Sequence, residues 1–247
     1  MVALLLVTAC GGPDRSDDLI VIDAGHGGHD CGAQCGGKQE KALVLQVVQK
    51  LRKEFKRKGY RVYLTRGNDT FLKLGERTRI ADKMDAKVFI SIHANAIADK
   101  SRFEAVEGIE TYFLQKTRDA RSQRVAAREN AAVLQGTDAL SKDVIIDSVL
   151  NGPKIVESNK LAIDVQHGIM RQVKSRYKDA VSGGVRPAPF YVLVGASRPS
   201  ILVEVGYITN SKERSRLFTS AYQERIAKGI VEGVSRYLDN RQRDLGV

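Results

Sequence analysis

The sequence LIVIDAGHGG, residues 19–28, decides the fold class of this 247-residue chain. Its first five residues form a nearly continuous apolar, β-branched run, typical of a strand buried on both faces of a parallel α/β sheet. The glycines that follow allow a sharp turn, so we expect His26 just beyond the carboxyl end of the strand, where open α/β sheets bind ligands. A histidine in a glycine-rich loop is often only a turn residue, so its function depends on features elsewhere in the chain.

After this stretch the sequence alternates between strands and helices. Helices are predicted at residues 40–58, 74–84, 159–177 and 221–238, and strands at 60–64, 86–92, 108–114, 190–194 and 200–205. Such alternation predicts parallel strands joined by right-handed crossovers. We therefore expect one α/β domain at residues 19–247, with a twisted, mostly parallel central sheet and helices on both of its faces.

Shorter segments receive more specific predictions. Residues 1–18 are expected to be a leader or a disordered lead-in, and residues from about 115 to 158, which are polar and rich in alanine, a helical insertion. The segment Ser182-Gly183-Gly184 is predicted as a hinge-like loop. Asn210 followed by Glu213 predicts a capping box at the start of a helix.

The formal net charge of +11 indicates an anionic partner. Nine lysines and arginines lie between Lys38 and Arg61, against Glu40 and Glu54, mostly around an apolar helical stripe. We interpret these charges first as the solvated side of a helix. Nucleic acid and an anionic cell-wall or membrane surface both fit the overall charge.

The first ten residues, MVALLLVTAC, place small residues before Cys10, as at the cleavage site of a bacterial lipoprotein. The positive and apolar regions of a signal peptide are both short here, so a misassigned start is an equal alternative. No apolar run approaches the roughly 20 residues needed to span a bilayer. Three cysteines in all exclude a disulfide framework, and Cys31 and Cys35 are expected either to bridge locally or to stay thiols.

Four ionisable residues lie in or next to predicted buried elements, where apolar residues are expected: His26, Glu40, His93 and Glu204. His93 ends the run VFISIH, and Glu204 interrupts the apolar run ILVEV. An unpaired carboxylate buried in such a strand is costly, so Glu204 requires a cation, a metal or a raised pKa. A structural salt bridge is the alternative for Glu204, and a favourable helix dipole is the alternative for Glu40 at the start of its helix.

These residue types match the chemistry of a catalytic zinc site. Two imidazoles and a carboxylate form a ligand set that leaves the fourth position to water. Zinc lowers the pKa of that water to roughly 7, and an unligated carboxylate can carry the proton to a leaving amine. The spacings of 14 residues from His26 to Glu40 and 53 from Glu40 to His93 are unlike the compact HExxH motif. His29 and His167 are expected at the surface.

The motifs together resemble the zinc-dependent N-acetylmuramoyl-L-alanine amidases of bacterial cell-wall remodelling. The resemblance runs from about residue 19 to residue 238 and rests, in order, on VIDAGHGGHDCGA, Glu40, LTR, ERTRIA, FISIHANA and ILVEVGYITN. It implies one zinc ion per chain, held by His26, Glu40 and His93, with Glu204 as the catalytic carboxylate. The implied reaction is hydrolysis of the amide between the lactyl group of N-acetylmuramic acid and L-alanine of the stem peptide.

The resemblance also implies supporting or substrate-binding roles for Asn95 and Arg77. The insertion at 115–158 resembles a segment that in the cell-division members covers the zinc until an activator protein binds. We therefore hypothesise that Glu129, or a neighbouring acid, occupies the water position in a resting state. Two thiols in the loop after His26, and the lack of an obvious wall-binding repeat, depart from the family pattern and leave the mode of wall attachment open.

Peptidoglycan, rather than nucleic acid, is therefore the expected partner, in wall remodelling or the separation of daughter cells. An exported, periplasmic or cell-envelope location follows, with membrane attachment only if Cys10 is lipidated. Another zinc hydrolase of the wall, a peptidase or a deacetylase, is the first alternative. A non-catalytic wall-binding module is the second, and it would be signalled by loss of either histidine or of Glu204, all of which are present.

Overall fold

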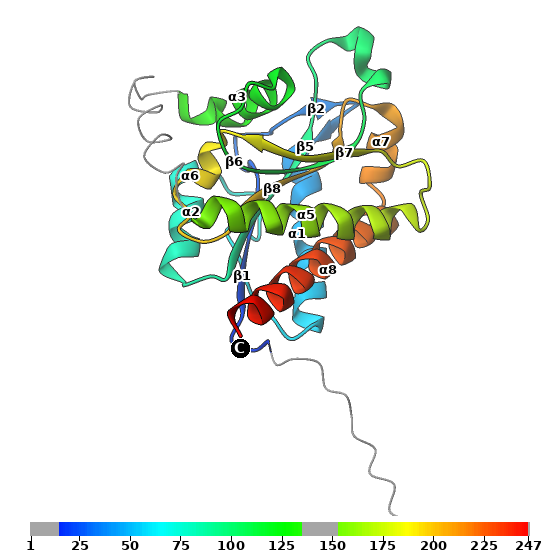
Figure 1. Cartoon of the computed structure of the whole chain (residues 1–247). Coiled ribbons are helices and arrows are strands. Elements are labelled where there is room, and N and C mark those ends of the chain that lie inside the picture. The colour runs from blue at the N-terminus through cyan, green and yellow to red at the C-terminus, as the bar shows by residue number, and fades with distance from the viewer. Residues whose placement is uncertain (1–14, 135–152, 247) are drawn as a thin grey trace, which may run out of the picture.

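The chain folds around a six-stranded sheet that carries helices on both faces (Figure 1). The structure is a computed structural model that describes residues 15–134 and 153–246. The strands are β1 (Leu19–Ala24), β2 (Gln34–Cys35), β3 (Lys38–Gln39), β4 (Arg61–Leu64), β5 (Val88–Asn95), β6 (Ile109–Leu114), β7 (Ser182–Ala188) and β8 (Ser200–Tyr207). The helices are α1 (Glu40–Arg57), α2 (Leu74–Lys83), η1 (Lys100–Ala105), α3 (Ala120–Leu134), α5 (Pro153–Lys174), α6 (Tyr191–Val194), α7 (Ser211–Leu217) and α8 (Ser220–Leu245).

The strand order of the main sheet is β4-β1-β5-β8-β6-β7, and β2 pairs only with β3. The strands β4, β1, β5 and β8 are parallel, as predicted. β6 runs antiparallel to β8, and β7 follows the direction of β6. The carboxyl ends of β1, β5 and β8 therefore meet at one edge of the sheet, where His93 of β5 lies opposite Glu204 of β8.

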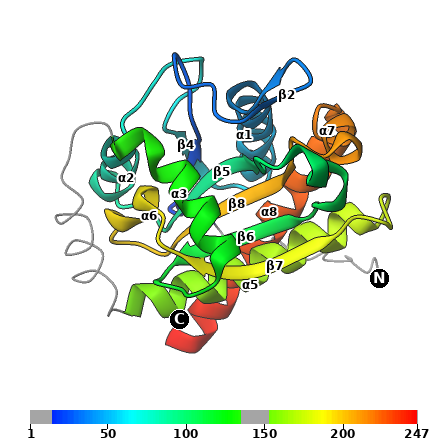
Figure 2. The same cartoon turned by 90° about the horizontal axis from the view of Figure 1, so that it is seen from above.

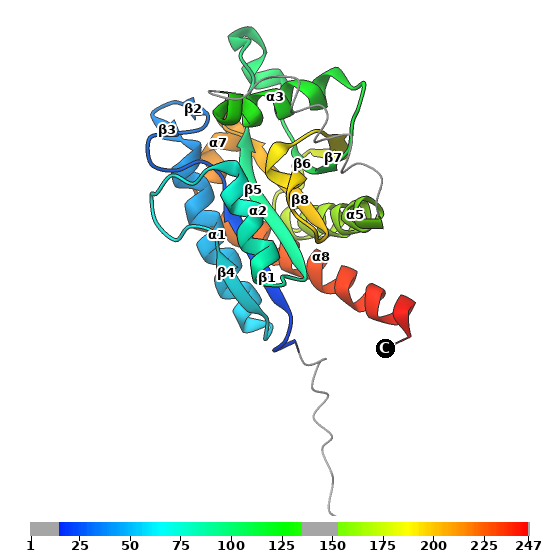
Figure 3. The same ribbon diagram turned by 90° about the vertical axis from the view of Figure 1, so that its left-hand side faces the viewer.

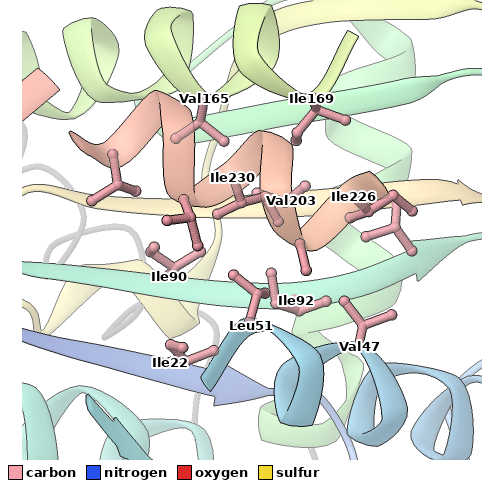
Figure 4. Packing of buried hydrophobic residues seen from close by; sticks show 14 of the residues in the cluster. Ile22, Val47, Leu51, Ile90, Ile92, Val165, Ile169, Val203, Ile226 and Ile230 are labelled. Carbon is pink, nitrogen blue, oxygen red and sulfur yellow. The ribbon is translucent and has the colours of Figure 1, made fainter. Parts of the chain in front are cut away.

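Alternate strand residues pack against different helical layers, because side chains of a strand point to opposite faces. The helices α1, α5 and α8 cover one face, and their aliphatic residues meet Ile22, Ile90 and Val203 of the sheet (Figure 4). The other face packs Val21 and Phe89 against α2, α3 and α6. α5 and α8 lie side by side (Figures 1 and 3). Burial of each large aliphatic side chain contributes about 1.5–3 kcal/mol, so the two layers hold the sheet edge in place.

Two predictions between α5 and β8 are wrong. The predicted hinge at Ser182–Gly184 is the first half of β7, and the predicted strand at 190–194 is the short helix α6. β7 is an edge strand, which tolerates glycine and Pro187 where a central strand would not. Short apolar runs do not distinguish a strand from a buried helical turn, and α6 buries Val192 and Leu193.

The predicted insertion is shorter than expected at its carboxyl end. α5 begins at Pro153 rather than at residue 159, so the last six residues of the 115–158 segment belong to a core helix. Proline is favoured at the first position of a helix, and Ile155 packs against the core. α3 confirms a helix within the insertion. Three further acids of the insertion, Asp138, Asp143 and Asp147, lie outside the described residues.

The described part of the predicted lead-in, residues 15–18, is held against the domain. Arg15 contacts Tyr60 and Asp239, and the amide of Arg61 donates to the carbonyl of Asp18. Cys10 lies outside the described residues. Within the described ranges no helix is long and apolar enough to cross a bilayer.

Glu213 forms half of the predicted capping box. The Asn210 side chain accepts from the amide of Glu213 at 3.0 Å, as expected for an N-cap. The Glu213 carboxylate instead accepts from the amides of Tyr207 and Gly108, at 2.7 and 3.0 Å. It thereby ties the end of β8 to the start of β6, and burial raises its pKa to about 7.

Glu213 should therefore make stability depend on pH. Its folded-state pKa lies above its ordinary value of 4.5, so its contribution is complete below pH 4.5 and is lost as the pH rises through 7. We expect Glu213→Gln to flatten the fall in unfolding free energy between about pH 4.5 and 7, measured by urea unfolding. Glu224→Gln, an exposed site on α8, is the control and should leave the profile in this range unchanged. An unaltered slope in Glu213→Gln would contradict the assignment.

Candidate metal centre

Four ionisable side chains from distant parts of the chain converge above the sheet edge. They are His26 after β1, Glu40 at the start of α1, His93 in β5 and Glu129 in α3, and one donor atom of each lies within 4.8 Å of the others. His26 Nε2 lies 3.2 Å from Glu40 Oε1 and 3.1 Å from Glu129 Oε2. His93 Nδ1 lies 3.1 Å and 2.9 Å from the same two oxygens.

This arrangement fits a tetrahedral metal ion. Zinc bonds of 2.0–2.2 Å would separate the donor atoms of a tetrahedral site by roughly 3.3 Å, close to the four distances above. His26 Nε2 and Glu129 Oε2 are buried and have no hydrogen-bond partner among the described residues. Buried polar atoms are normally satisfied, so a cation at their centre accounts for both.

The backbone around His26 is adapted to this site. His26 has a φ of 59°, a left-handed conformation that a residue with a side chain adopts at a cost of about 1–2 kcal/mol. Gly25 leaves room for the second ligand, because a Cβ at this position would lie 2.4 Å from Cε1 of His93. The glycines of the opening motif therefore serve the close approach of two imidazoles as well as the turn.

Two buried arginines hold the loop that presents His26. Arg77 donates to the carbonyls of Ala24 and His26 and to the carboxylate of Asp23, at 2.6, 2.9 and 2.9 Å. Arg66 donates to the carbonyls of Ala24 and Gly25. The LTR and ERTRIA motifs thus fix the conformation of the first motif. The interpretation of Arg77 as a supporting residue agrees with this geometry.

Outer contacts orient the ligand side chains. His26 Nδ1 lies 2.9 Å from Asp30 Oδ2, which directs Nε2 toward the cluster. Glu40 accepts from the amides of Ala33 and Ala94, both at 2.8 Å. Glu40 is therefore a fully buried, oriented carboxylate, and a role limited to the dipole of α1 does not account for these contacts.

The charges of the cluster favour a bound cation. Burial opposes protonation of His93, but Glu129 and Glu40 outweigh it and raise the pKa of His93 to about 9. Burial also lowers the pKa of His26 and Glu40 raises it. The net result is again a pKa above the ordinary range. Both imidazoles must lose a proton to bind a metal, so metal loading should release protons and weaken at low pH.

Glu204 lies beside this cluster and is not one of its four members. It is fully buried, and its Oε2 has no hydrogen-bond partner among the described residues. Burial, together with Glu129 and Glu40, raises its pKa well above the ordinary range, although Arg128 opposes the shift. A buried carboxyl with a raised pKa is suited to proton transfer.

The helix α3 covers this edge of the sheet (Figure 2). Glu129 reaches the two imidazoles, and Arg128 Nη2 lies 2.6 Å from Glu129 Oε1 and 3.3 Å from Glu204 Oε1. A cavity of about 380 Å³ beside α3 is lined by His26, among other residues. Among the acids of the insertion that the structure describes, Glu129 is thus the one that lies at the site.

The remaining candidates of the sequence are not members of the four-residue ligand cluster. His29 is exposed and stacks on Phe71, and His167 is exposed on α5 beside Arg236. Cys31 and Cys35 are free thiols and no disulfide joins them.

Sequence reasoning missed Asp23, Asp30 and Arg128. Asp23 could have been found by the argument applied to Glu204, since it also is an acid in an apolar strand. Asp30 and Arg128 carry no such signal, because a charge in a loop or on a polar helix usually faces solvent.

A family model described as N-acetylmuramoyl-L-alanine amidase matches residues 20–236. The chain belongs to this amidase family. It is 34% identical over 224 residues to N-acetylmuramoyl-L-alanine amidase AmiA of Escherichia coli strain K12, a match that covers 89% of the chain and 75% of AmiA.

Solved amidase structures share the fold. AmiC2 of Nostoc punctiforme is 29% identical, with a TM-score of 0.66 over 92% of this chain and 99% of that one. The CwlD amidase of Clostridioides difficile, solved in complex with the GerS lipoprotein, is 27% identical with a TM-score of 0.65, over 90% and 99%. The predicted fold class and the resemblance are confirmed. The amidase hydrolyses the bond between N-acetylmuramic acid and L-alanine in peptidoglycan, in cell-wall remodelling.

Arg77 should control metal affinity in this amidase through His26. Arg77→Lys keeps the charge but cannot reach three acceptors of the loop, so we expect a loss of about 10- to 100-fold in affinity for zinc, the range for outer contacts of metal ligands. Competition with a chromogenic chelator measures this. Arg79→Lys, two residues further along α2 and exposed, is the matched control. Equal affinity in the Arg77 and Arg79 variants would contradict the positioning role.

Proposed function

We propose that the amidase is a zinc enzyme whose ion is held by His26, Glu40 and His93, with Glu204 as the catalytic acid and base. The tetrahedral fit of the donor atoms supports zinc, because two imidazoles and a carboxylate are a common catalytic ligand set. When bound, zinc supplies a Lewis acid that polarises a carbonyl and makes water acidic. The single observation that carries the proposal is the convergence of the donor atoms directly beside the buried Glu204.

The chain's own residues then perform the proton transfers. Glu204 removes a proton from the attacking water and delivers it to the nitrogen of the departing L-alanine. Burial raises the pKa of Glu204, which makes its carboxylate a stronger base for the first step. Asp30 and Arg77 act on the orientation of His26.

Another hydrolase of the wall would leave different products. A peptidase would cut cross-links between stem peptides, and a deacetylase would leave free amino groups on the sugars. Mass analysis of digested peptidoglycan separates both from a free stem peptide that begins with L-alanine. A digest without that peptide would overturn the amidase assignment.

Replacing Glu204 by Gln tests the proposed mechanism. We expect zinc to stay bound and hydrolysis to fall about 10²- to 10⁴-fold, the usual contribution of general acid and base catalysis. Metal content and release of stem peptide are measured on the same preparation. Glu54→Gln, near the end of α1 opposite to Glu40 and paired with Arg57, is the control. Near-normal turnover in Glu204→Gln would show that another group transfers the proton.

We propose further that α3 holds the enzyme in a resting state. Glu129 would fill the fourth ligand position, which the water needs, and Arg128 pairs with the carboxylate of Glu204. One helix therefore blocks both the metal and the catalytic carboxylate. α3 also buries Val125 and Ala126 in the core. Detaching the helix exposes this apolar surface, so a binding partner is needed to offset the cost.

Glu129→Ala should therefore raise basal hydrolysis of purified peptidoglycan. A coupling of 1–3 kcal/mol between a helix and a site corresponds to about 5- to 150-fold. Arg124→Ala, on the exposed side of the same helix, is the control and should behave as the wild type. Deletion of the insertion should act in the same direction as Glu129→Ala. Unchanged activity in a folded Glu129→Ala protein would refute the resting-state role.

The partner and the location follow from the substrate. A protein that binds the 115–158 insertion is the proposed activator, supported by the complex of the CwlD amidase with the GerS lipoprotein. Peptidoglycan lies outside the cytoplasmic membrane, so we place the enzyme in the periplasm or cell envelope. The net charge of +11 favours the anionic wall, and attachment to the membrane depends on lipidation of Cys10.

A further inference from the structure

Glu110 on β6 is a second buried carboxylate at the reaction edge, directly opposite Glu204 in the strand pairing. Its Oε2 accepts from Asn95 Nδ2 at 2.9 Å, and from the hydroxyls of Tyr112 and Tyr207 at 3.0 and 3.2 Å. Burial and Glu110 hold the pKa of both tyrosines above the ordinary range, so they remain donors.

Two arginines balance the charge of Glu110. Its Oε1 lies 2.7 Å from Arg121 Nη2 and 3.2 Å from Arg186 Nε. The backbone leaves space for this group, because a Cβ on Gly183 of β7 would lie 2.2 Å from Glu110 Cγ. Glu110 is therefore a paired, fully buried carboxylate that the proposed chemistry does not use.

Glu110 decides which way the amide of Asn95 faces. A carboxylate only accepts hydrogen bonds, so the NH₂ group of Asn95 must point toward it. The carbonyl oxygen of Asn95 then points away, and it accepts from the amide of Ala96 and from Arg128 Nη1, both at 2.9 Å. A flipped Asn95 would set its oxygen against the carboxylate of Glu110.

Arg128 shows what this oxygen can bind. Its Nη1 donates to Asn95 Oδ1 and its Nη2 to Glu204 Oε1, so the two acceptors face neighbouring N–H groups of one guanidinium. The nitrogen of the scissile amide must approach Glu204 to receive its proton, and this nitrogen carries an N–H. When α3 leaves the site, the second lone pair of the Asn95 oxygen becomes available to that group.

We propose that Glu110 is a positioning residue that locks the Asn95 carbonyl oxygen toward the N–H of the leaving L-alanine nitrogen. The inference rests on the proposed roles of Glu204 and α3. The hydrogen bond strengthens as the nitrogen gains its proton, so its loss lowers kcat more than it raises KM. Glu110 itself does not contact the substrate.

The proposal is tested by exchanging the carboxylate at position 110 and the amide at position 95. The experiment uses the Glu129→Ala protein, with a soluble N-acetylmuramoyl tripeptide as substrate. Glu110→Gln alone frees the Asn95 amide to flip and should lower kcat about 3- to 10-fold, the value of one neutral hydrogen bond. Adding Asn95→Asp conserves the total charge. The side-chain amide at position 110 then donates to one oxygen of the new carboxylate at position 95. The other oxygen of that carboxylate faces the substrate, so kcat should recover to within about twofold of the parent.

Asn95→Asp alone sets two carboxylates against each other and should be the least active of the three variants. Arg57→Gln, an exposed site on α1 that pairs with Glu54, is the control and should leave kcat unchanged. If the exchanged double variant is no better than Glu110→Gln, Glu110 has only a structural role and the proposal fails. If the Glu129→Ala parent releases no stem peptide from peptidoglycan, the proposed function fails instead.

Discussion

Buried carboxylates at one sheet edge impose the constraint on which the rest of the structure depends. Asp23, Glu40, Glu110, Glu129 and Glu204 are at most 5% exposed and lie around the carboxyl ends of the central strands. Each ionised group would be costly there without a compensating cation. Arginines, imidazoles and the space for a metal ion supply that compensation, and the loops of the site are arranged to bring them within reach.

The compensating groups fall into a permanent set and an exchangeable set. Arg77 pairs with Asp23 and holds loop carbonyls that no conformational change needs to release. Arg121 and Arg128 belong to α3, so their pairs with Glu110 and Glu204 exist only while this helix is docked. A helix that neutralises two buried carboxylates of the sheet, and also covers apolar core, is stable in place until a partner provides an alternative. This division agrees with the proposal that α3 is a movable cover over a rigid ligand cluster.

The first half of the fold was predictable because local pattern and tertiary environment agree there. β1, α1 and α2 have the periodicity that the core requires, and each predicted range differs from the observed one by a single residue at its carboxyl end. The predictions for residues 182–194 were wrong because the conformation of this segment depends on its neighbours. β7 exists only because β6 offers it an open edge, and α6 is too short for a period to be read from its residues.

By itself, the sequence singled out the proposed ligands His26 and His93 and the proposed catalytic carboxylate Glu204, because His93 and Glu204 interrupt strands that burial otherwise keeps apolar and His26 directly follows one. Glu40 joined them through its place at a helix start and through the family motifs. Only the tertiary structure decided which acid of the insertion reaches the imidazoles, and that Arg128 and Glu110 act on the same site. Those contacts join segments up to 103 residues apart, from His26 to Glu129, and no local pattern encodes which charged groups of a polar helix turn inward. The opening LIVIDAGHGG stretch therefore indicated a proposed ligand, and only the packing of α3 brought Glu129 and Arg128 to it.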